Sequence, residues 1–314
     1  DMAFIHSCYT QTNNHSPALF QINTGMSRMG FPCVGSWTTY GLGSESKNLP
    51  AFVVMYDTLG RGLPKGYASN WSAGFLPGVY QGTALNAQGA PIDNMNRSAV
   101  MSDSDQRRQL DLLARLNAAH QAEHPGEEEL AARIESFELA YRMQTAAPEA
   151  FDLDSEPANI RKLYGLDEKK CTHFAKQALT ARRLVERGVR FVQIYSGGME
   201  NQLSWDGHND IEGNHRGFAQ ETDQPIAALP TVTEVSRTSL LCGRLAIGTA
   251  AHEKSGFAGH AGLLAHSRNE ASGPTNRVGR GIATARDTGQ LSGFSSRYPN
   301  RRKAKSDDMT ASIP

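Results

Sequence analysis

Short apolar runs alternate with segments of helical periodicity along most of the chain. The run at 51–56 is apolar throughout, which is typical of a strand buried on both faces of a parallel sheet. Shorter strand-like runs occur at 4–8 and 189–195. Segments that repeat apolar side chains at helical spacing lie at 103–121, 128–146 and 173–187. Strands separated by helices predict an α/β fold whose sheet is connected by crossovers.

Turn-forming residues mark where these elements begin and end. Ser16 is the expected N-cap of a short helix, with Pro17 at its first position and Gly25 at its end. Residues 61–98 are rich in Gly, Pro and Asn and lack periodicity, so they predict a long loop. Long loops in compact domains are often functional, so this segment is a candidate binding region.

The pattern changes beyond residue 230. Thr222 starts what we expect to be an ordinary helix, and the apolar pattern is lost after Pro230. Residues 231–314 hold 12 Lys and Arg against 6 Asp and Glu, whereas residues 1–230 hold 20 against 26. The tail has only three of the 24 aromatic residues, too few to bury much apolar surface. We therefore expect two parts, a folded core at 1–230 and an atypical basic tail at 231–314.

Two hypotheses for the tail stay open: a disordered basic arm that contacts an acidic partner, or an aberrant, out-of-frame translation, which we favour. At the other end, the chain starts with Asp1 inside a strand-like run, which indicates that upstream residues are missing. No targeting segment is visible in the sequence.

Charge and hydropathy limit the classes of partner that this chain is expected to bind. The formal net charge of the 314 residues is zero, so no global basic field favours nucleic acid. No apolar run of about 18 residues occurs, so we expect no membrane span. The four cysteines form no Cys-x-x-Cys pair, so a zinc knuckle or a disulfide framework is not expected.

Two polar clusters follow predicted strands, at the sheet edge where ligands bind in open α/β folds. The first runs from Thr10 to Ser16, before a helix N-terminus that favours anions; helix capping is the competing explanation. The second spans 204–210, where Asp206 and His208 alternate around a glycine and offer metal-ligand chemistry; a solvated loop is the alternative. No Gly-x-Ser-x-Gly elbow, Walker loop or Gly-x-Gly-x-x-Gly motif follows a strand.

Several motifs occur in the order seen in one family of bacterial exported proteins. They are Asn-His-Ser-Pro-Ala at 14–18, Asn-Thr-Gly at 23–25, Gly-Ser-Trp at 35–37, Tyr-Gly-Leu-Gly at 40–43, Asn-Leu-Pro at 48–50, Gly-Phe-Leu-Pro at 74–77, Tyr-Gln-Gly at 80–82, the Ala-to-Arg segment at 181–190, Trp-Asp-Gly-His at 205–208 and Asn-His at 214–215. Over residues 1–229 the chain thus resembles the domain-of-unknown-function 1501 family. That family is similar in fold to sulfatases and alkaline phosphatases.

The resemblance implies an alkaline-phosphatase-like α/β/α sandwich and metal-dependent hydrolysis of sulfate or phosphate esters. Asp206 and His208 would be ligands of a divalent metal (Zn, Ca or Mg), and Thr10, Asn14 and His15 would be catalytic residues near the nucleophile position, with Thr10 as the nucleophile. The substrate would be a small anionic ester or a sulfated glycan, and the location periplasmic or extracellular. No Cys-x-Pro-x-Arg motif, the source of formylglycine in sulfatases, is present.

The departures from the family pattern predict a sandwich that is incomplete at both ends. The opening strand with its acidic residue is absent, and so are Gly-Glu-Phe-Gly-Arg and the following Asp-His segment. We therefore expect this chain to be inactive or unstable. The alternative function is a non-catalytic exported binding protein on the same scaffold, which would use the 61–98 loop.

Re-sequencing of the DNA that encodes residues 225–314, read in all three frames, tests the tail. We expect another frame to encode Gly-Glu-Phe-Gly-Arg followed by an Asp-His segment. If no frame does, the tail is genuine and the binding-protein hypothesis moves ahead of the enzyme.

Overall fold

The computed structural model describes most of residues 9–235 and two later strands. The described ranges are 9–86, 90–92, 101–124, 128–199, 201–235, 244–249 and 261–266. The chain divides into two units, 1–270 and 271–314, and the second lies outside the described residues, as does the strand expected at 4–8. All described helices and strands belong to the first unit.

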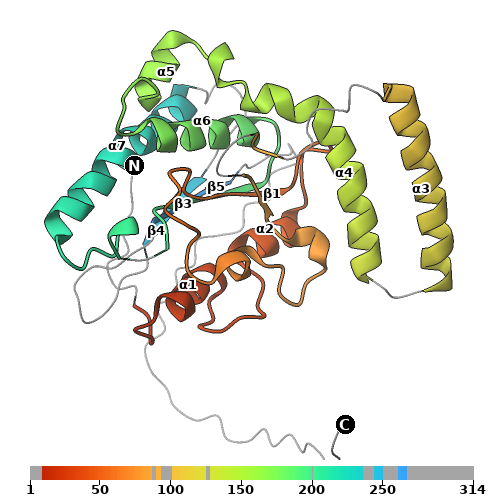
Figure 1. Cartoon of the computed structure of the whole chain (residues 1–314), viewed down its shortest axis with the longest axis horizontal. Helices are drawn as coiled ribbons and strands as arrows, with labels where there is room; N and C mark the ends of the chain where they lie inside the picture. The colour runs from red at the N-terminus through yellow and green to blue at the C-terminus, as the bar shows by residue number, and fades with distance from the viewer. Residues whose placement is uncertain are drawn as a thin grey trace, which may run out of the picture. The chain divides into compact units, whose positions relative to one another are not determined.

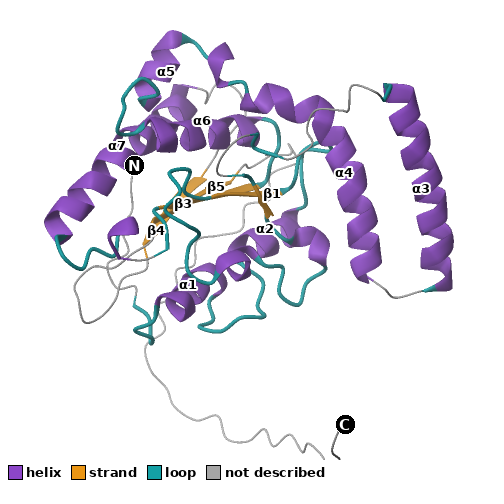
Figure 2. Ribbon diagram, in the orientation of Figure 1, coloured by secondary structure: helices purple, strands orange, loops and turns teal. Residues whose placement is uncertain are grey.

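Helices and strands alternate along the described chain, as Figures 1 and 2 show. In chain order they are α1 (His15–Thr24), α2 (Val34–Leu42), β1 (Phe52–Met55), β2 (Thr83–Ala84), α3 (Asp103–Glu123), α4 (Glu128–Phe151), α5 (Ala158–Tyr164), α6 (Thr172–Glu186), β3 (Phe191–Ser196), α7 (Ile211–Val235), β4 (Arg244–Thr249) and β5 (Ala261–His266). Four short 3₁₀ turns, η1 (Tyr67–Trp71), η2 (Gly78–Tyr80), η3 (Leu153–Ser155) and η4 (Asn201–Leu203), lie in the connections.

The sheet has the strand order β2-β1-β3-β5-β4. β1 pairs in parallel with both β2 and β3, and Val53 faces Val192 in the register of the central pair. β5 pairs antiparallel with β3, and β4 pairs antiparallel with β5. The fold is therefore mixed α/β, with three parallel strands at the heart of the described chain.

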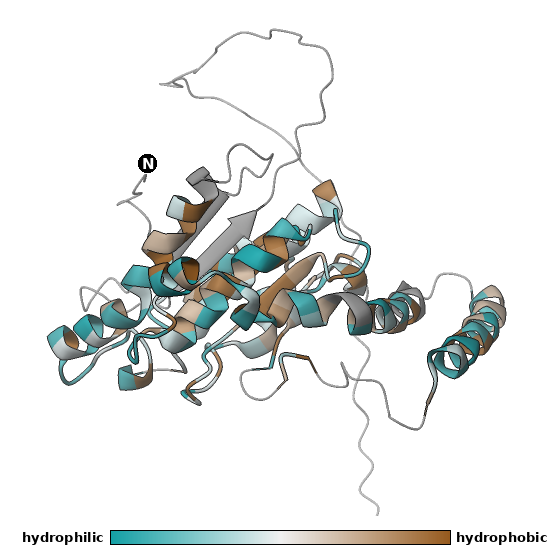
Figure 3. Ribbon diagram, turned by 90° about the horizontal axis from the view of Figure 1, so that it is seen from above, coloured by the Kyte–Doolittle hydropathy of each residue, from teal (hydrophilic) through white to brown (hydrophobic). Residues whose placement is uncertain are grey.

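Helices cover both faces of the sheet, with α5, α6 and α7 on one side and α1 and α2 on the other (Figure 1). Side chains alternate between the two faces of the sheet along each strand, so β1 contributes side chains to two hydrophobic cores. Val53 and Met55 join the core under α6, whereas Phe52 and Val54 join the core over α2. The central strands accordingly carry apolar residues on both faces and are brown in Figure 3. Burial on both faces explains why the run at 51–56 is apolar throughout.

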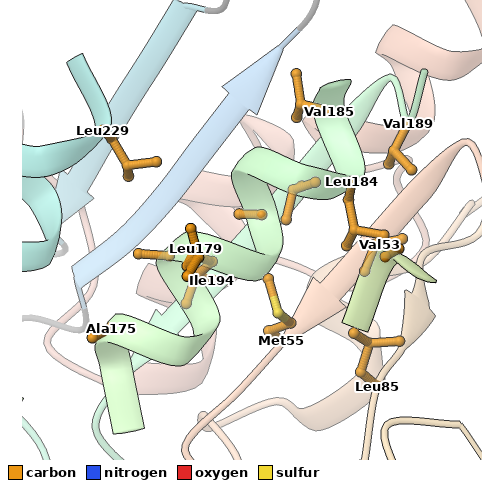
Figure 4. Close-up of a cluster of buried hydrophobic side chains, with 14 of the residues drawn as sticks. Val53, Met55, Leu85, Ala175, Leu179, Leu184, Val185, Val189, Ile194 and Leu229 are labelled. Atoms are coloured by element: carbon orange, nitrogen blue, oxygen red, sulfur yellow. The ribbon is translucent and has the colours of Figure 1, made fainter. Parts of the chain in front are cut away.

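The core under α6 is the larger one, and Figure 4 shows its side chains. Leu179 and Leu184 of α6 are completely or almost completely buried, and they lie over Val53 and Ile194 of the two central strands. The helix ends at Arg187 and Gly188, where the backbone turns directly into β3. The packing of one helix across two adjacent strands fixes the sheet edge from which the polar loops leave.

The structure confirms most elements expected from the hydrophobic pattern, with shifts at their ends. The prediction that Ser16 caps the first helix was wrong, because Asn14 is the N-cap and its side chain accepts a hydrogen bond from the Ser16 backbone N–H. Gly25 does end that helix, at a φ of 80° that favours glycine. Helix α2 and helix α5 were not expected from the pattern.

The prediction of a helix start at Thr222 was also wrong, because α7 begins at Ile211 and continues to Val235 through Pro225 and Pro230. Thr222 lies in the middle of the helix, where its hydroxyl donates to the carbonyl of Phe218. Packing against α5 and α6 holds the helix together where its sequence predicts a break. Two segments of the expected tail form β4 and β5, and the division into core and tail stays a prediction. Within the described residues, no helix is long and apolar enough to cross a membrane.

The buried contacts of Leu179 predict a large loss of stability on truncation. We expect Leu179→Ala to lower the free energy of unfolding by about 2–5 kcal/mol, because a cavity replaces the lost side chain. Leu116→Ala is the matched control, since Leu116 on α3 is 60% exposed and its loss leaves no cavity. Urea unfolding followed by circular dichroism measures both, and equal effects would contradict the packing described.

Candidate active site

The two polar clusters expected at the sheet edge meet in space. His15, at the start of α1, places its Nε2 atom 2.9 Å from the Oδ2 atom of Asp206. His208 places its own Nε2 atom 2.9 Å from the same oxygen. The three side chains come from segments about 190 residues apart in the chain. A single carboxylate oxygen therefore joins the N-terminus of α1 to the loop after β3.

Asp206 is the buried centre of this arrangement, with 5% of its surface exposed. Its Oδ2 atom also lies 3.4 Å from the backbone N–H of Asn201, and its own N–H donates to the Ser204 hydroxyl. Burial of a carboxylate is costly unless hydrogen-bond donors compensate, and here the two imidazoles and a backbone amide do so. His208 is exposed, so the site reaches solvent on its side.

The residues next to Asp206 are held by β3 and α7. The indole N–H of Trp205 donates to the Ser196 hydroxyl at the end of β3, at 3.1 Å. The ring of Trp205 stacks on Phe218 of α7 at 5.3 Å, and the Nε2 atom of His215 lies 2.7 Å from the Trp205 carbonyl oxygen. The Asn214 side chain also donates to the Ser204 carbonyl, at 3.1 Å. The two residues before Asp206 are therefore held by both β3 and α7, which restricts the position of its carboxylate.

The other two predicted catalytic residues lie nearby with local partners. The hydroxyl of Thr10 is largely buried and donates to the Gln21 side chain at 2.8 Å, within the same segment. The Asn14 side chain caps α1. Both residues belong to the loop that carries His15, but the contacts described here bring only His15 to Asp206.

The donor set at this site has the chemistry of a divalent cation site. Two imidazole nitrogens and one carboxylate oxygen are standard ligands for zinc and similar ions. In the arrangement described, however, both nitrogens face the carboxylate oxygen directly. Among the described residues, no group of three or more His, Cys, Asp or Glu side chains is spaced to hold a metal ion. The side chains of His15, Asp206 and His208 are therefore of the types that bind a divalent cation. Their present arrangement is that of a hydrogen-bonded cluster.

A second charged cluster lies beside β1, and the sequence analysis missed it. Asp57 follows the strand and is 3% exposed. Its Oδ2 atom accepts from the guanidinium of Arg61, with nitrogen–oxygen distances of 2.8 and 2.5 Å. The same guanidinium donates to both carboxylate oxygens of Glu221 on α7, at 3.0 and 2.8 Å. The available signal was an Asp directly after a buried strand with an Arg four residues later.

Hydrogen bonding sets the protonation of Glu221 and Arg61 in this cluster. Burial opposes ionisation of Glu221, but hydrogen bonds from His173 and Arg61 outweigh it and lower the pKa of its carboxyl. Burial also opposes the charge of Arg61, and its bonds to Glu221 and Asp57 raise the pKa of the guanidinium above its ordinary value. Glu221 and Arg61 are therefore both ionised at neutral pH.

Arg61 also connects the two loops at the sheet edge. Its carbonyl oxygen accepts from the backbone N–H of Met199, at 3.1 Å, in the loop that leads to Asp206. The neighbouring Gly198 has no room for a side chain, because a Cβ there would lie 1.9 Å from the same oxygen. The loops after β1 and β3 are thus in direct backbone contact.

The lowered pKa of Glu221 predicts a stability difference that depends on pH. A group whose pKa falls on folding stabilises above its unfolded pKa, about 4.3 for a glutamate, and loses that effect as pH falls through the folded value. We expect Glu221→Gln to cost about 1–3 kcal/mol at pH 7 and progressively less below about pH 4.

Glu212→Gln is the control on the same helix, because Glu212 is largely exposed and pairs only with Arg216 among the described contacts. It should change stability by less than about 0.5 kcal/mol, as surface ion pairs do. Urea unfolding at a series of pH values measures both variants. A cost for Glu221→Gln that does not shrink in acid would contradict the assignment.

Comparison with known proteins gives one match. The family model described as a protein of unknown function, DUF1501, matches residues 1–240. No curated protein and no solved structure matches. Because the match spans most of the 314 residues, this chain belongs to the DUF1501 family.

Proposed function

We propose that this chain has the architecture of a metal-dependent hydrolase of small sulfate or phosphate esters, inactive in this incomplete form, and that the site is built on His15, Asp206 and His208. The observation that supports the proposal is the meeting of two imidazoles on one buried carboxylate oxygen. The site lies beyond the carboxyl end of β3, where ligands bind in open α/β sheets. The residue types supply both proton transfer and cation binding, which ester hydrolysis uses.

Asp206 determines which ring nitrogens are free to react. An imidazole that donates from Nε2 to the carboxylate carries its lone pair on Nδ1. In His208, which is exposed, that nitrogen would accept a proton from a water molecule as the water attacks the ester. The negative charge of Asp206 would stabilise the imidazolium that forms, as the orienting carboxylate does in other His–Asp pairs.

A divalent cation is part of the proposal. His15, Asp206 and His208 would hold it, and when bound it would polarise the ester oxygen and lower the pKa of a water molecule. Binding would require both Nε2 atoms to be deprotonated, so cation affinity should fall as pH falls. A neutral imidazole then carries its proton on Nδ1, so with the cation bound the water would lose its proton to solvent, and His208 would be the base only in the cation-free cluster. Thr10 remains the proposed nucleophile: its oxygen would displace the alcohol of the ester, which takes up the hydroxyl proton, and the activated water would then cleave the ester formed on Thr10. Asn14 would line the same loop.

We extend the proposal to the fold family and to the cellular location of the protein. Helices on both faces of a sheet with three parallel strands are compatible with an alkaline-phosphatase-like sandwich, and we propose that assignment. We also propose that the protein acts in the periplasm or outside the cell. A small anionic ester or a sulfated glycan is the proposed substrate.

A row of exposed aromatic rings favours a second candidate, a non-catalytic exported binding protein. The rings of Trp37, Tyr40 and Tyr80 and that of Phe75 contact one another edge to face, with centroids 5.3 to 6.1 Å apart. Phe75 is 64% exposed, and two of these rings belong to the predicted 61–98 loop region. Exposed aromatic rows suit the apolar faces of sugar rings, so the ligand would be a glycan.

Substitution of the central carboxylate tests the enzyme. After incubation with Zn²⁺, Ca²⁺ or Mg²⁺ and desalting, we expect the wild type to retain about one ion per chain. An intact relative that keeps Gly-Glu-Phe-Gly-Arg and the Asp-His segment should also cleave 4-nitrophenyl phosphate or 4-nitrophenyl sulfate, whereas this chain is expected to be inactive. Asp206→Asn keeps the shape of the side chain and removes its charge, so it should retain no ion, and the same substitution in the relative should lower turnover at least about 100-fold. Elemental analysis and absorbance at 405 nm are the measurements.

Asp223→Asn, an exposed position on α7, is the matched control and should change neither quantity. Absence of bound cation in this chain, together with absence of turnover of both ester classes by the relative, would refute the enzyme. Bound cation without turnover in this chain would support the site and the incomplete catalytic set expected from the sequence. Binding of a sulfated glycan that survives joint substitution of Asp206 and His208 by Ala would favour the binding protein.

A further inference from the structure

A cavity of about 1310 Å³ lies between the end of β1 and helices α5, α6 and α7. His15, Asp206 and His208 are not among its lining residues. Its apolar wall is formed by buried and half-buried side chains, namely Met55, Leu85, Phe151, Leu153 and Leu166. This volume exceeds that of most small-molecule sites, so it accommodates an extended ligand.

Basic side chains also line the cavity. Lys169, Lys170 and Lys176 all line the cavity near the start of α6. Lys170 donates to the neutral side chain of Gln220, and no carboxylate among the described residues pairs with any of the three lysines. By contrast, Arg161 pairs with Asp154 and is already neutralised. The lining holds four basic side chains, Arg161 and the three lysines, against the carboxylates of Asp152, Asp154 and Glu221, an excess of one positive charge.

A hydroxyl adds a polar group to the lining. Thr180 lies one turn beyond Lys176 on α6, lines the cavity and is 7% exposed as a residue. Its hydroxyl is not one of the buried polar atoms that lack a partner among the described residues, so it is open to the cavity. The neighbouring Gln177 is already used, since its amide donates to the Tyr56 carbonyl at 2.6 Å. Thr180 thus offers a donor and an acceptor to a bound molecule.

Helix α7 separates the cavity from the His15–Asp206–His208 cluster. Gly217 and Glu221 line the cavity, whereas His215 and Phe218 contact Trp205 beside Asp206. The two sites thus lie on different faces of one helix. Occupation of the cavity does not require a change at the proposed active site.

We propose that this cavity binds an amphipathic anion, a molecule with a phosphonate, phosphate, sulfate or carboxylate head and an alkyl chain. The head group would lie near Lys169 and Lys176 and accept a hydrogen bond from Thr180, and the chain would lie along Leu85 and Leu153. An anionic head compensates the lysine charges, and the alkyl chain removes apolar surface from water. A cationic amphiphile would face like charges.

Calorimetric titration of the full chain with octylphosphonate tests the proposal. This probe has no ester bond, so hydrolysis at the other site cannot consume it. We expect micromolar binding, with methylphosphonate at least about tenfold weaker because it lacks the chain, and no binding of octyltrimethylammonium. Lys169→Gln combined with Lys176→Gln should weaken octylphosphonate about tenfold, the size of one or two charge-assisted contacts. Thr180→Val should weaken it about fivefold through loss of one hydrogen bond.

Lys47→Gln is the matched control, because Lys47 is exposed and does not line the cavity. It should leave affinity within twofold of the wild type. All three lysines are on the surface, so these variants test binding without unfolding the core. Asp206→Asn should bind octylphosphonate normally, which separates this proposal from the proposed hydrolase. No binding, equal binding of the cationic probe, or equal effects of the control and the double variant would overturn it.

Discussion

The guanidinium of Arg61 connects segments that are far apart in the chain. It donates four hydrogen bonds, two to Asp57 after β1 and two to Glu221 on α7, and the backbone carbonyl of Arg61 accepts a fifth from Met199 after β3. The guanidinium compensates the negative charge of the two carboxylates, and each of these groups would be costly to bury alone. This cluster sets the distance of α7 from the sheet edge. The position of the loop that carries Asp206 depends on α7 and on the sheet edge.

The candidate active site is built on that frame. Trp205 is held by Ser196 of β3 on one side and by His215 and Phe218 of α7 on the other. The position of Asp206 therefore depends on the spacing between a strand and a helix as well as on its hydrogen bonds to Asn201 and Ser204 in its own loop. A loop held by a strand and a helix loses little entropy when it binds a substrate, which suits an active site.

The same helix α7 has different chemistry on its two sides. Toward Trp205 it presents aromatic and imidazole side chains that support the Asp206 loop. Toward the cavity it presents Gln220 and Glu221, which bind Lys170 and Arg61. A packed helix between two sites allows their ligands to differ in size and charge. An ester site and a site for an amphipathic anion are compatible in one chain of this size.

The sequence alone determined the two central strands, β1 and β3, and the positions of the polar clusters in the chain. The apolar run at 51–56 predicted a strand buried on both faces, because only such a strand needs apolar residues at every position. Gly25 predicted the end of α1 for a similar local reason, since the left-handed turn favours glycine. Asp206 and His208 were found from their position after a strand.

Only the tertiary structure decided which groups meet. The continuation of α7 through Pro225 and Pro230 depends on packing against its neighbours, which no local pattern encodes. His15 became the partner of Asp206, and Arg61 the partner of Glu221, through contacts across about 190 and 160 residues of chain. Distances between side chains so far apart in sequence follow from how the sheet and helices pack, and local periodicity carries no information about them.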